Sequence, residues 1–227
     1  MTIRRIPTKE TVLWCALLAA MAGDILISWA LPLFCADYSC MKMSVSALGS
    51  PLSPVRLPFD LWMLLEGVLF LVALPALFRL YRPVSAGIAY TMAAFVAAFA
   101  VGACVFTCFF SVNESKDVVT AASMIHGVGS AVGFMLFLFV PLLMAILSWK
   151  SRESLMGTVC IVSFAAAMLF FVLFVMADKP EFSGTVIENE GLWQRLNLIF
   201  MYAPLVIVSV RRMRMSANET KSRSRDN

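Results

Sequence analysis

The sequence predicts an all-α, polytopic integral membrane protein, a bundle of six transmembrane helices. Hydrophobic residues make up 61% of the 227 positions and charged residues only 14%, too few to cover a water-soluble surface. The apolar residues form runs long enough to cross a bilayer. Backbone groups in lipid must satisfy their own hydrogen bonds, and the short alternating segments of a β-barrel do not occur, so each run is predicted to be a helix.

The chain is expected to form one membrane domain, residues 12–210. A cytoplasmic N-terminal segment, residues 1–11, is expected before it, and a basic, disordered cytoplasmic tail, residues 211–227, after it. The six predicted spans are residues 12–34, 59–80, 84–110, 121–147, 155–177 and 192–210.

The first span carries Asp24 near its middle, about 15 Å from the outer end of the helix. The connection that follows, residues 35–58, is the longest in the chain, and its prolines prevent it from forming one helix. A short helix or turn is expected from Ser44 to Gly49. Because only half of the connection is polar, we expect it to lie on or dip into the membrane interface.

The second span carries Glu66 and ends in a basic turn. The third span has small residues at helical spacing, which favours close packing against another helix. The fourth span carries the only histidine, His126, followed by Gly129 and Gly133, whose spacing also favours the close approach of a helix. An acidic loop, residues 178–190, leads from the fifth span to the sixth.

Lys and Arg residues are distributed unequally between the two sides of the predicted bundle. Thirteen of them lie in the N-terminal segment, the 2–3 and 4–5 connections and the tail, whereas four lie in the other three connections. Cytoplasmic loops of membrane proteins are rich in Lys and Arg. The bias therefore predicts a multi-pass protein of the cell membrane with both termini in the cytoplasm.

Three ionisable side chains fall at similar depths in the second, fourth and sixth spans. Glu66, His126 and Arg195 lie about 10, 8 and 5 Å below the outer ends of their helices. Ionisable groups within a membrane normally face the bundle interior or a water-filled cavity, so we expect an outward-facing polar pocket. The candidate pocket residues are Asp24, Ser44, Ser46, Glu66, His126, Gln194 and Arg195. The alternative is a set of structural interactions, in which Glu66 pairs with Arg195 and Asp24 either binds His126 or stays protonated.

Six cysteines are present, and four of them fall inside spans, where Cys packs as a small apolar residue. Cys35 and Cys40 lie in the first connection. They could form a disulfide in an oxidising compartment, a pairing that their spacing alone does not establish. No zinc-type spacing occurs, one histidine cannot supply a multi-histidine metal site, and no cofactor is expected.

Three short motifs carry a resemblance to a known family. They are Ser46-Ala47-Leu48-Gly49 after the first span, His126 near the start of the fourth, and Gly191-Leu192-Trp193-Gln194-Arg195 at the start of the sixth. With them, residues 12–210 resemble the prokaryotic membrane proteins grouped as domain of unknown function 998 (DUF998), and more distantly the DRAM-like and Sfk-like membrane proteins of eukaryotes. The resemblance implies a six-helix membrane protein with a polar cluster on its outer side, and it implies no activity.

Two functions of different classes fit these observations. The first is a non-enzymatic membrane protein that binds membrane lipids or a small amphiphilic ligand, with Arg195 holding an anionic headgroup. The second is an intramembrane hydrolase or transferase. In it His126 would be the general base, Glu66 or Asp24 would orient it, Arg195 would stabilise an oxyanion, and Ser44 or Ser46 would be the nucleophile. The sequence favours the first, because no nucleophile elbow is present.

A small transporter is a further alternative, although the two halves of the chain share no internal similarity. Nucleic-acid binding has no support, because the basic tail is short and lacks interleaved aromatic residues. The sequence does not specify an oligomeric state.

Overall fold

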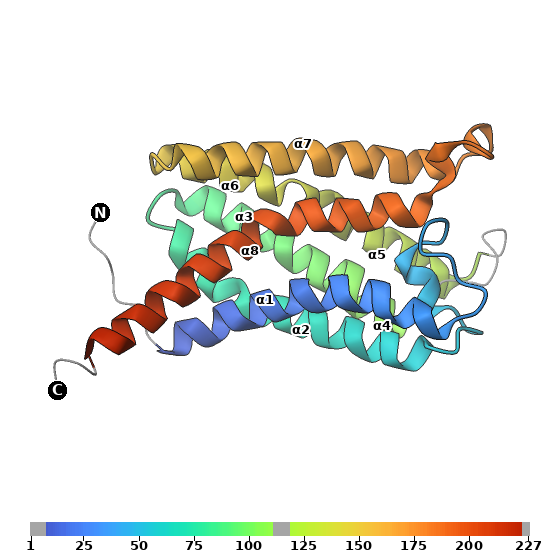
Figure 1. The fold of residues 1–227 in the computed structure, drawn as a ribbon, viewed down its shortest axis with the longest axis horizontal. Coiled ribbons are helices and arrows are strands. Elements are labelled where there is room, and N and C mark those ends of the chain that lie inside the picture. Colours follow the sequence, from blue (N-terminus) through green and yellow to red (C-terminus); the bar gives the residue numbers. More distant parts are fainter. Residues whose placement is uncertain (1–7, 111–118, 224–227) are drawn as a thin grey trace.

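A computed structural model describes residues 8–110 and 119–223, and every regular element in these ranges is helical (Figure 1). Six of the helical stretches are long and apolar enough to cross a membrane. The predicted class, an all-α polytopic bundle, is therefore confirmed. Residues 1–7 of the expected N-terminal segment and residues 224–227 of the expected tail lie outside the described residues.

The six spans contain more helical elements than the hydropathy pattern indicates, because two spans are interrupted. In chain order the elements are α1 (Thr8–Ala30), η1 (Leu31–Phe34), η2 (Val45–Gly49), α2 (Arg56–Tyr81), α3 (Ala86–Phe99), the π-helical η3 (Ala100–Val105), α4 (Phe106–Phe109), α5 (Ala121–Leu138), α6 (Val140–Lys150), α7 (Ser154–Ala177), η4 (Pro180–Phe182), η5 (Val186–Glu188) and α8 (Glu190–Arg223). The short helix predicted after Ser44 is η2.

The third and fourth spans each depart from regular α-helix at one point, and the third does so where it touches the fourth. The π-helical turn η3 presents Gly102 to Gly129 of α5, so closely that a Cβ atom on Gly102 would collide with the carbonyl of Gly129. The fourth span breaks at Phe139, whose N–H bonds to the carbonyl of Leu136 in a tighter turn. The break precedes Pro141, which has no N–H to continue the α-helical pattern.

The sixth span differs from the expected one at its C-terminal end. A disordered tail was expected from residue 211, but α8 continues to Arg223. Two ion pairs hold the start of this extension: Arg211 lies 3.3 Å from Glu153, just before α7, and Arg212 lies 3.6 Å from Glu10 of α1. Because these arginines have partners on neighbouring elements, the helix continues past the apolar segment.

Neighbouring helices pack in the order α2–α1–α8–α7–α6, and α3 packs against both α2 and α5. At the centre, four aromatic rings from α2, α3, α5 and α8 meet with centroids 4.6–6.3 Å apart, mostly edge to face. These rings belong to Phe70, Phe99, Phe137 and Tyr202. They close the middle of the bundle and separate its two ends.

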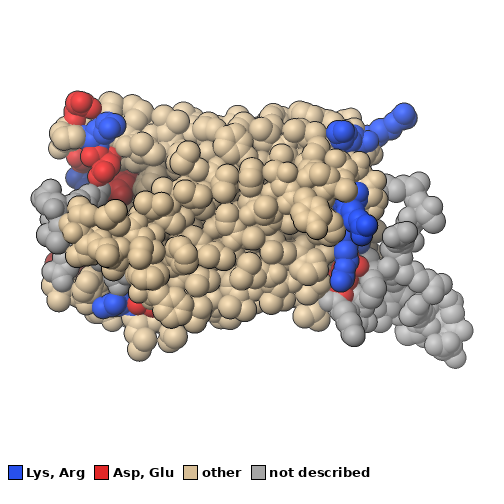
Figure 2. Space-filling model, turned by 180° about the vertical axis from the view of Figure 1, so that it is seen from behind, with Lys and Arg blue, Asp and Glu red and all other residues tan. Residues whose placement is uncertain are grey.

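The connections at residues 31–55 and 178–189 lie at one end of the bundle, which we call the loop end (Figure 1). The start of α1 and the end of α8 lie at the opposite, terminal end. In Figure 2, Asp and Glu side chains gather mainly at the loop end, Lys and Arg dominate the terminal end, and the broad surface between is uncharged. On this face, an uncharged surface between two charged ends is what is expected of a protein that spans a bilayer.

Candidate functional site

A cavity of about 640 Å³ opens in the loop half of the bundle. Its volume lies within the range of small-molecule binding sites. The helices α2, α5, α7 and α8 and the segment 42–47 form most of its wall. The polar side chains of the wall are those of Asp24, Lys42, Ser44, Ser46, Glu66, Thr107, His126, Ser130, Asp178, Glu190 and Gln194. Its aromatic side chains are those of Phe59, Phe99, Phe134, Phe171 and Phe174.

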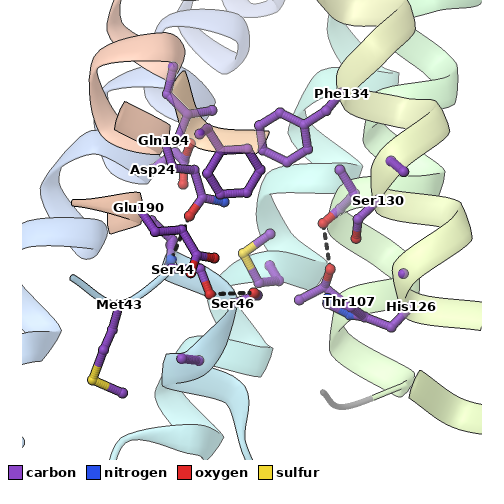
Figure 3. Close-up of a pocket in the computed structure, with 18 of the residues that line it drawn as sticks. Asp24, Met43, Ser44, Ser46, Thr107, His126, Ser130, Phe134, Glu190 and Gln194 are labelled. Carbon is purple, nitrogen blue, oxygen red and sulfur yellow. Dashed lines mark hydrogen bonds between the residues drawn. The ribbon is translucent and has the colours of Figure 1, made fainter. Parts of the chain in front are cut away.

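Six of the seven residues predicted from the sequence line this cavity, and Arg195 does not. Figure 3 shows two polar walls that face each other across the space. Asp24, Gln194, Ser44 and Ser46 lie on one side, and His126 lies on the other. The structure thus brings together residues from α1, the first connection, α2, α5 and α8.

Arg195 instead holds the first connection in place. Its side chain is fully buried, and its guanidinium donates hydrogen bonds to the carbonyls of Ser28 (2.8 and 3.2 Å), Cys40 (2.9 Å), Met43 (3.3 Å) and Gly191 (2.9 Å). It also donates to the Tyr38 hydroxyl at 2.9 Å. The predicted ion pair of Glu66 with Arg195 is wrong, because carbonyl oxygens rather than a carboxylate are the partners of the guanidinium.

One of these carbonyls is available for a local reason. In a regular α-helix the carbonyl of Ser28 would accept from the N–H of residue 32, but residue 32 is proline and has none. Arg195 supplies two donors in its place. The guanidinium also lies 5.3 Å from the ring centroid of Trp29 and 5.8 Å from that of Tyr38. The Arg195 side chain therefore bonds to both α1 and the first connection.

The start of α8 fits closely against the same connection. Gln194 Oε1 accepts a hydrogen bond of 2.7 Å from the N–H of Val45, and the N–H of Leu192 donates to the carbonyl of Met41 at 3.0 Å. A Cβ atom on Gly191 would collide with the carbonyls of Met43 and Cys40. The motif Gly191–Arg195 therefore holds the segment that forms the mouth of the cavity.

At the deep end of the cavity, one hydroxyl lies between two carboxyl groups. Tyr202 donates a hydrogen bond of 2.8 Å to Oδ2 of Asp24, and its oxygen lies 3.4 Å from Oε1 of Glu66. Glu66 is fully buried, and its Oε2 has no hydrogen-bond partner. Asp24 thus has Tyr202 rather than His126 as its hydrogen-bond partner. Tyr202 was not among the residues predicted from the sequence, although a tyrosine hydroxyl within an apolar span needs a partner.

The opposite wall presents polar atoms of α4 and α5. His126 is 6% exposed, and its Nδ1 has no hydrogen-bond partner. The buried hydroxyl oxygen of Ser130 also has no hydrogen-bond partner. The Thr107 hydroxyl donates to the carbonyl of Ala103 at 2.6 Å, within the third span. Ser130 and Thr107 were also missed. Ser130 lies four residues after His126 on the same helix face, a spacing that could have revealed it.

The cavity also reaches the side of the bundle between α5 and α7. Its wall includes exposed residues on both helices: Gly127 and Ala131 on α5 and Val175 on α7. A Cβ atom added to Gly127 would have no neighbour within 4 Å. The helix α6 packs along α7, but α5 barely touches it. The two helices therefore leave a lateral slot, lined by Gly127, Ala131, Phe171, Phe174 and Val175.

Electrostatic contacts at the loop end join the first connection to the loop before α8. Lys42 forms an ion pair of 2.5 Å with Glu188, which also accepts a hydrogen bond from the N–H of Gly184 at 2.7 Å. The Lys42 hydrogen bond, the Gly184 N–H and the Lys42 charge lower the pKa of Glu188. Burial raises the pKa of Tyr38, and the Arg195 charge and hydrogen bond oppose this increase.

Cys35 and Cys40 are free thiols in the structure, and Cys35 Sγ donates to the carbonyl of Leu31 at 3.7 Å. The disulfide considered from the sequence is therefore not formed here. No three His, Cys, Asp or Glu side chains gather as metal ligands within the ranges 8–110 and 119–223.

The model of one family, described as proteins of unknown function (DUF998), matches residues 14–211. The match covers all six membrane-spanning stretches and the first connection. No curated protein and no solved structure matches the chain.

Proposed function

The chain belongs to the DUF998 family, and we propose that it binds a lipid or another small amphiphile in the cavity at the loop end. We further propose that it lies in the cell membrane with both termini in the cytoplasm. The orientation is supported by the thirteen Lys and Arg residues in the segments predicted for that side. The loop end, with the mouth of the cavity, then faces outward.

The observation that carries the proposal is the pairing of a polar deep end with a lateral slot. Polar atoms of Asp24, Glu66 and His126 line a space that a solvated headgroup could fill. The slot between α5 and α7 lies within the apolar part of both helices. A ligand with its headgroup in the cavity could therefore extend its chain through the slot into the bilayer. Neither end would then be placed in an unfavourable solvent.

The contacts favour binding over the alternative hydrolase. The Ser44 and Ser46 hydroxyls lie 3.3 Å apart and bond to each other, and within the described residues neither bonds to His126. Arg195, the candidate oxyanion stabiliser, points all its donors at other groups. The nucleophile, base and stabiliser therefore do not come together as a catalytic unit would require.

The test uses two helical glycines, at each of which a larger side chain would have open space. Gly127 faces the slot, whereas Gly87 lies on α3 near the terminal end, and a Cβ atom would meet nothing within 4 Å at either position. Gly127→Leu should fill the slot without displacing a neighbour, and Gly87→Leu makes the same chemical change elsewhere. The full chain in a neutral maltoside detergent is titrated with a dodecyl glycol ether, and the bound fraction is measured by native mass spectrometry.

We expect Gly127→Leu to weaken binding about tenfold or more, a loss of at least about 1.4 kcal/mol, and Gly87→Leu to leave it unchanged. Equal binding by the two variants would show that the amphiphile does not use the slot. An absence of saturable binding by the unaltered chain would contradict the proposed function.

A further inference from the structure

We infer that the amphiphile bound in this cavity carries a cationic ammonium headgroup, held at the deep end by Asp24 and Glu66. This inference rests on the proposed function and adds the chemical class of the ligand. It replaces the sequence-based expectation of an anionic headgroup bound by Arg195.

The charges around the cavity are predominantly acidic. Four carboxyl groups line it, from Asp24 and Glu66 at the deep end and from Asp178 and Glu190 nearer the mouth. Among the described residues, Lys42 is the one Lys or Arg in the wall, and it is paired with Glu188. Within the described part of the wall, a phosphate or carboxylate headgroup would therefore meet like charges and find no guanidinium or free ammonium partner.

Few hydrogen-bond donors lie near the carboxyl pair of the deep end: the Tyr202 hydroxyl and the indole N–H of Trp62. The single Tyr202 proton is directed at Asp24, with its oxygen 2.8 Å from Oδ2, which leaves Oε2 of the fully buried Glu66 without a partner. On the opposite wall, Nδ1 of the buried His126 is a second atom without a partner. A buried polar atom is costly unless it is paired. A ligand nitrogen with positive charge would satisfy the carboxyl pair, and a primary ammonium could donate to the imidazole as well.

The remaining wall suits an organic cation. Phe59, Phe99, Phe134, Phe171 and Phe174 contribute aromatic rings to the cavity. The faces of aromatic rings attract ammonium groups, most strongly where water is excluded. At about 640 Å³ the space is also far larger than a single desolvated inorganic ion requires. Carboxyl groups and phenyl rings together therefore favour an alkylammonium headgroup.

The test compares three amphiphiles that share a dodecyl chain and differ in headgroup charge. Dodecyltrimethylammonium, dodecyl phosphate and a neutral dodecyl glycol ether are added at matched mole fractions to the full chain in a maltoside detergent. Native mass spectrometry measures each bound fraction for the unaltered chain and for Glu66→Gln, Asp24→Asn and the control Glu153→Gln. Glu153 lies near the terminal end, where it pairs with Arg211. Thermal unfolding checks that each variant is folded.

We expect the unaltered chain and Glu153→Gln to prefer the ammonium compound over the phosphate by about tenfold or more. Glu66→Gln, which keeps the shape of the side chain and removes its charge, should reduce this preference to within about threefold while the neutral compound still binds. Asp24→Asn provides the same comparison if Glu66→Gln does not fold.

Equal binding of the three compounds by the unaltered chain would overturn the ammonium inference and leave the proposed function intact. Binding of tetramethylammonium as tight as that of the dodecyl compound would instead contradict the proposed function, because the chain of the ligand would contribute nothing.

Discussion

The guanidinium of Arg195 and the hydroxyl of Tyr38 lie 2.9 Å apart and form one hydrogen-bonded unit at the loop end. Tyr38 donates onward to the carbonyl of Ser44 at 2.7 Å, next to the mouth of the cavity. Two side chains therefore hold the first connection. Arg195 donates to the carbonyls of Cys40 and Met43, and Tyr38 donates to that of Ser44. The shape of the cavity depends on this unit, although neither side chain lines it.

Replacing Arg195 should unfold the loop end even when no ligand is present. Arg195→Ala removes donors from four carbonyls and one hydroxyl, so we expect the free energy of unfolding to fall by about 3–5 kcal/mol. The exposed Arg211, whose side chain makes one ion pair, is the matched control, and Arg211→Ala should cost less than about 1 kcal/mol. Chemical denaturation in detergent measures both. Equal stability of the two variants would contradict the structural role of Arg195.

A methyl group at Gly191 should displace the first connection. In Gly191→Ala the new Cβ collides with the carbonyls of Met43 and Cys40, so the segment must move away from α8. Gly87→Ala has open space in front of it and should be neutral or stabilising by up to about 1 kcal/mol. Proteolysis of the segment measures the difference. A Gly191→Ala variant as resistant as the unaltered chain would show that the close approach is unnecessary.

Hydropathy predicted the six spans because run length and apolar composition are local properties of the chain. The partner of Arg195 could not be predicted in the same way. A buried arginine usually has an acidic partner, and Glu66 at a similar depth satisfied that expectation. The actual partners are backbone carbonyls, freed by Pro32 and by the irregular path of residues 35–44. Carbonyl groups carry no sequence signal, so only the folded geometry shows them.

The ion pair between Lys42 and Glu188 should weaken in acid. The contact with Lys42 lowers the pKa of Glu188 below its ordinary value of 4.5. The contribution of the pair to stability is therefore complete above that value and is lost as the pH falls through the lowered folded-state pKa. Hydrogen-exchange protection factors for residues 39–44 should decrease from about pH 6 to about pH 3. In Lys42→Gln the protection factors of these residues should not show this decrease. If Lys42→Gln shows the same decrease, another titrating group causes it.

The hydroxyl of Tyr202 should contribute more to stability than an exposed tyrosine hydroxyl. Tyr202→Phe removes the proton donated to Asp24 and leaves this buried carboxyl group without its donor, so it should cost about 1–3 kcal/mol. Tyr90, which is 69% exposed on α3, is the matched control, and Tyr90→Phe should change stability by less than about 0.5 kcal/mol. Equal midpoints of thermal unfolding would show that the Tyr202 hydroxyl is not needed.

The candidate pocket was partly predictable for a physical reason. Polar side chains are costly in lipid, so Asp24, Glu66 and His126 had to face the interior, and helix depth placed them at one end. The lateral slot at Gly127 could not be predicted, because it depends on how closely α5 and α7 pack, and the sequence of neither helix specifies that distance.

The most direct measurement of the central claim is the position of a bound amphiphile. A dodecyl glycol ether with a diazirine at the first carbon of its chain is bound to the full chain in detergent and photolysed, and the labelled residues are mapped by mass spectrometry. We expect labels in the cavity wall, on residues 44–47 and on Ser130, Ala131 and Phe134, and their loss in Gly127→Leu. Labels confined to Val128, Val132 and other exposed apolar side chains on the outer faces of the helices would contradict it.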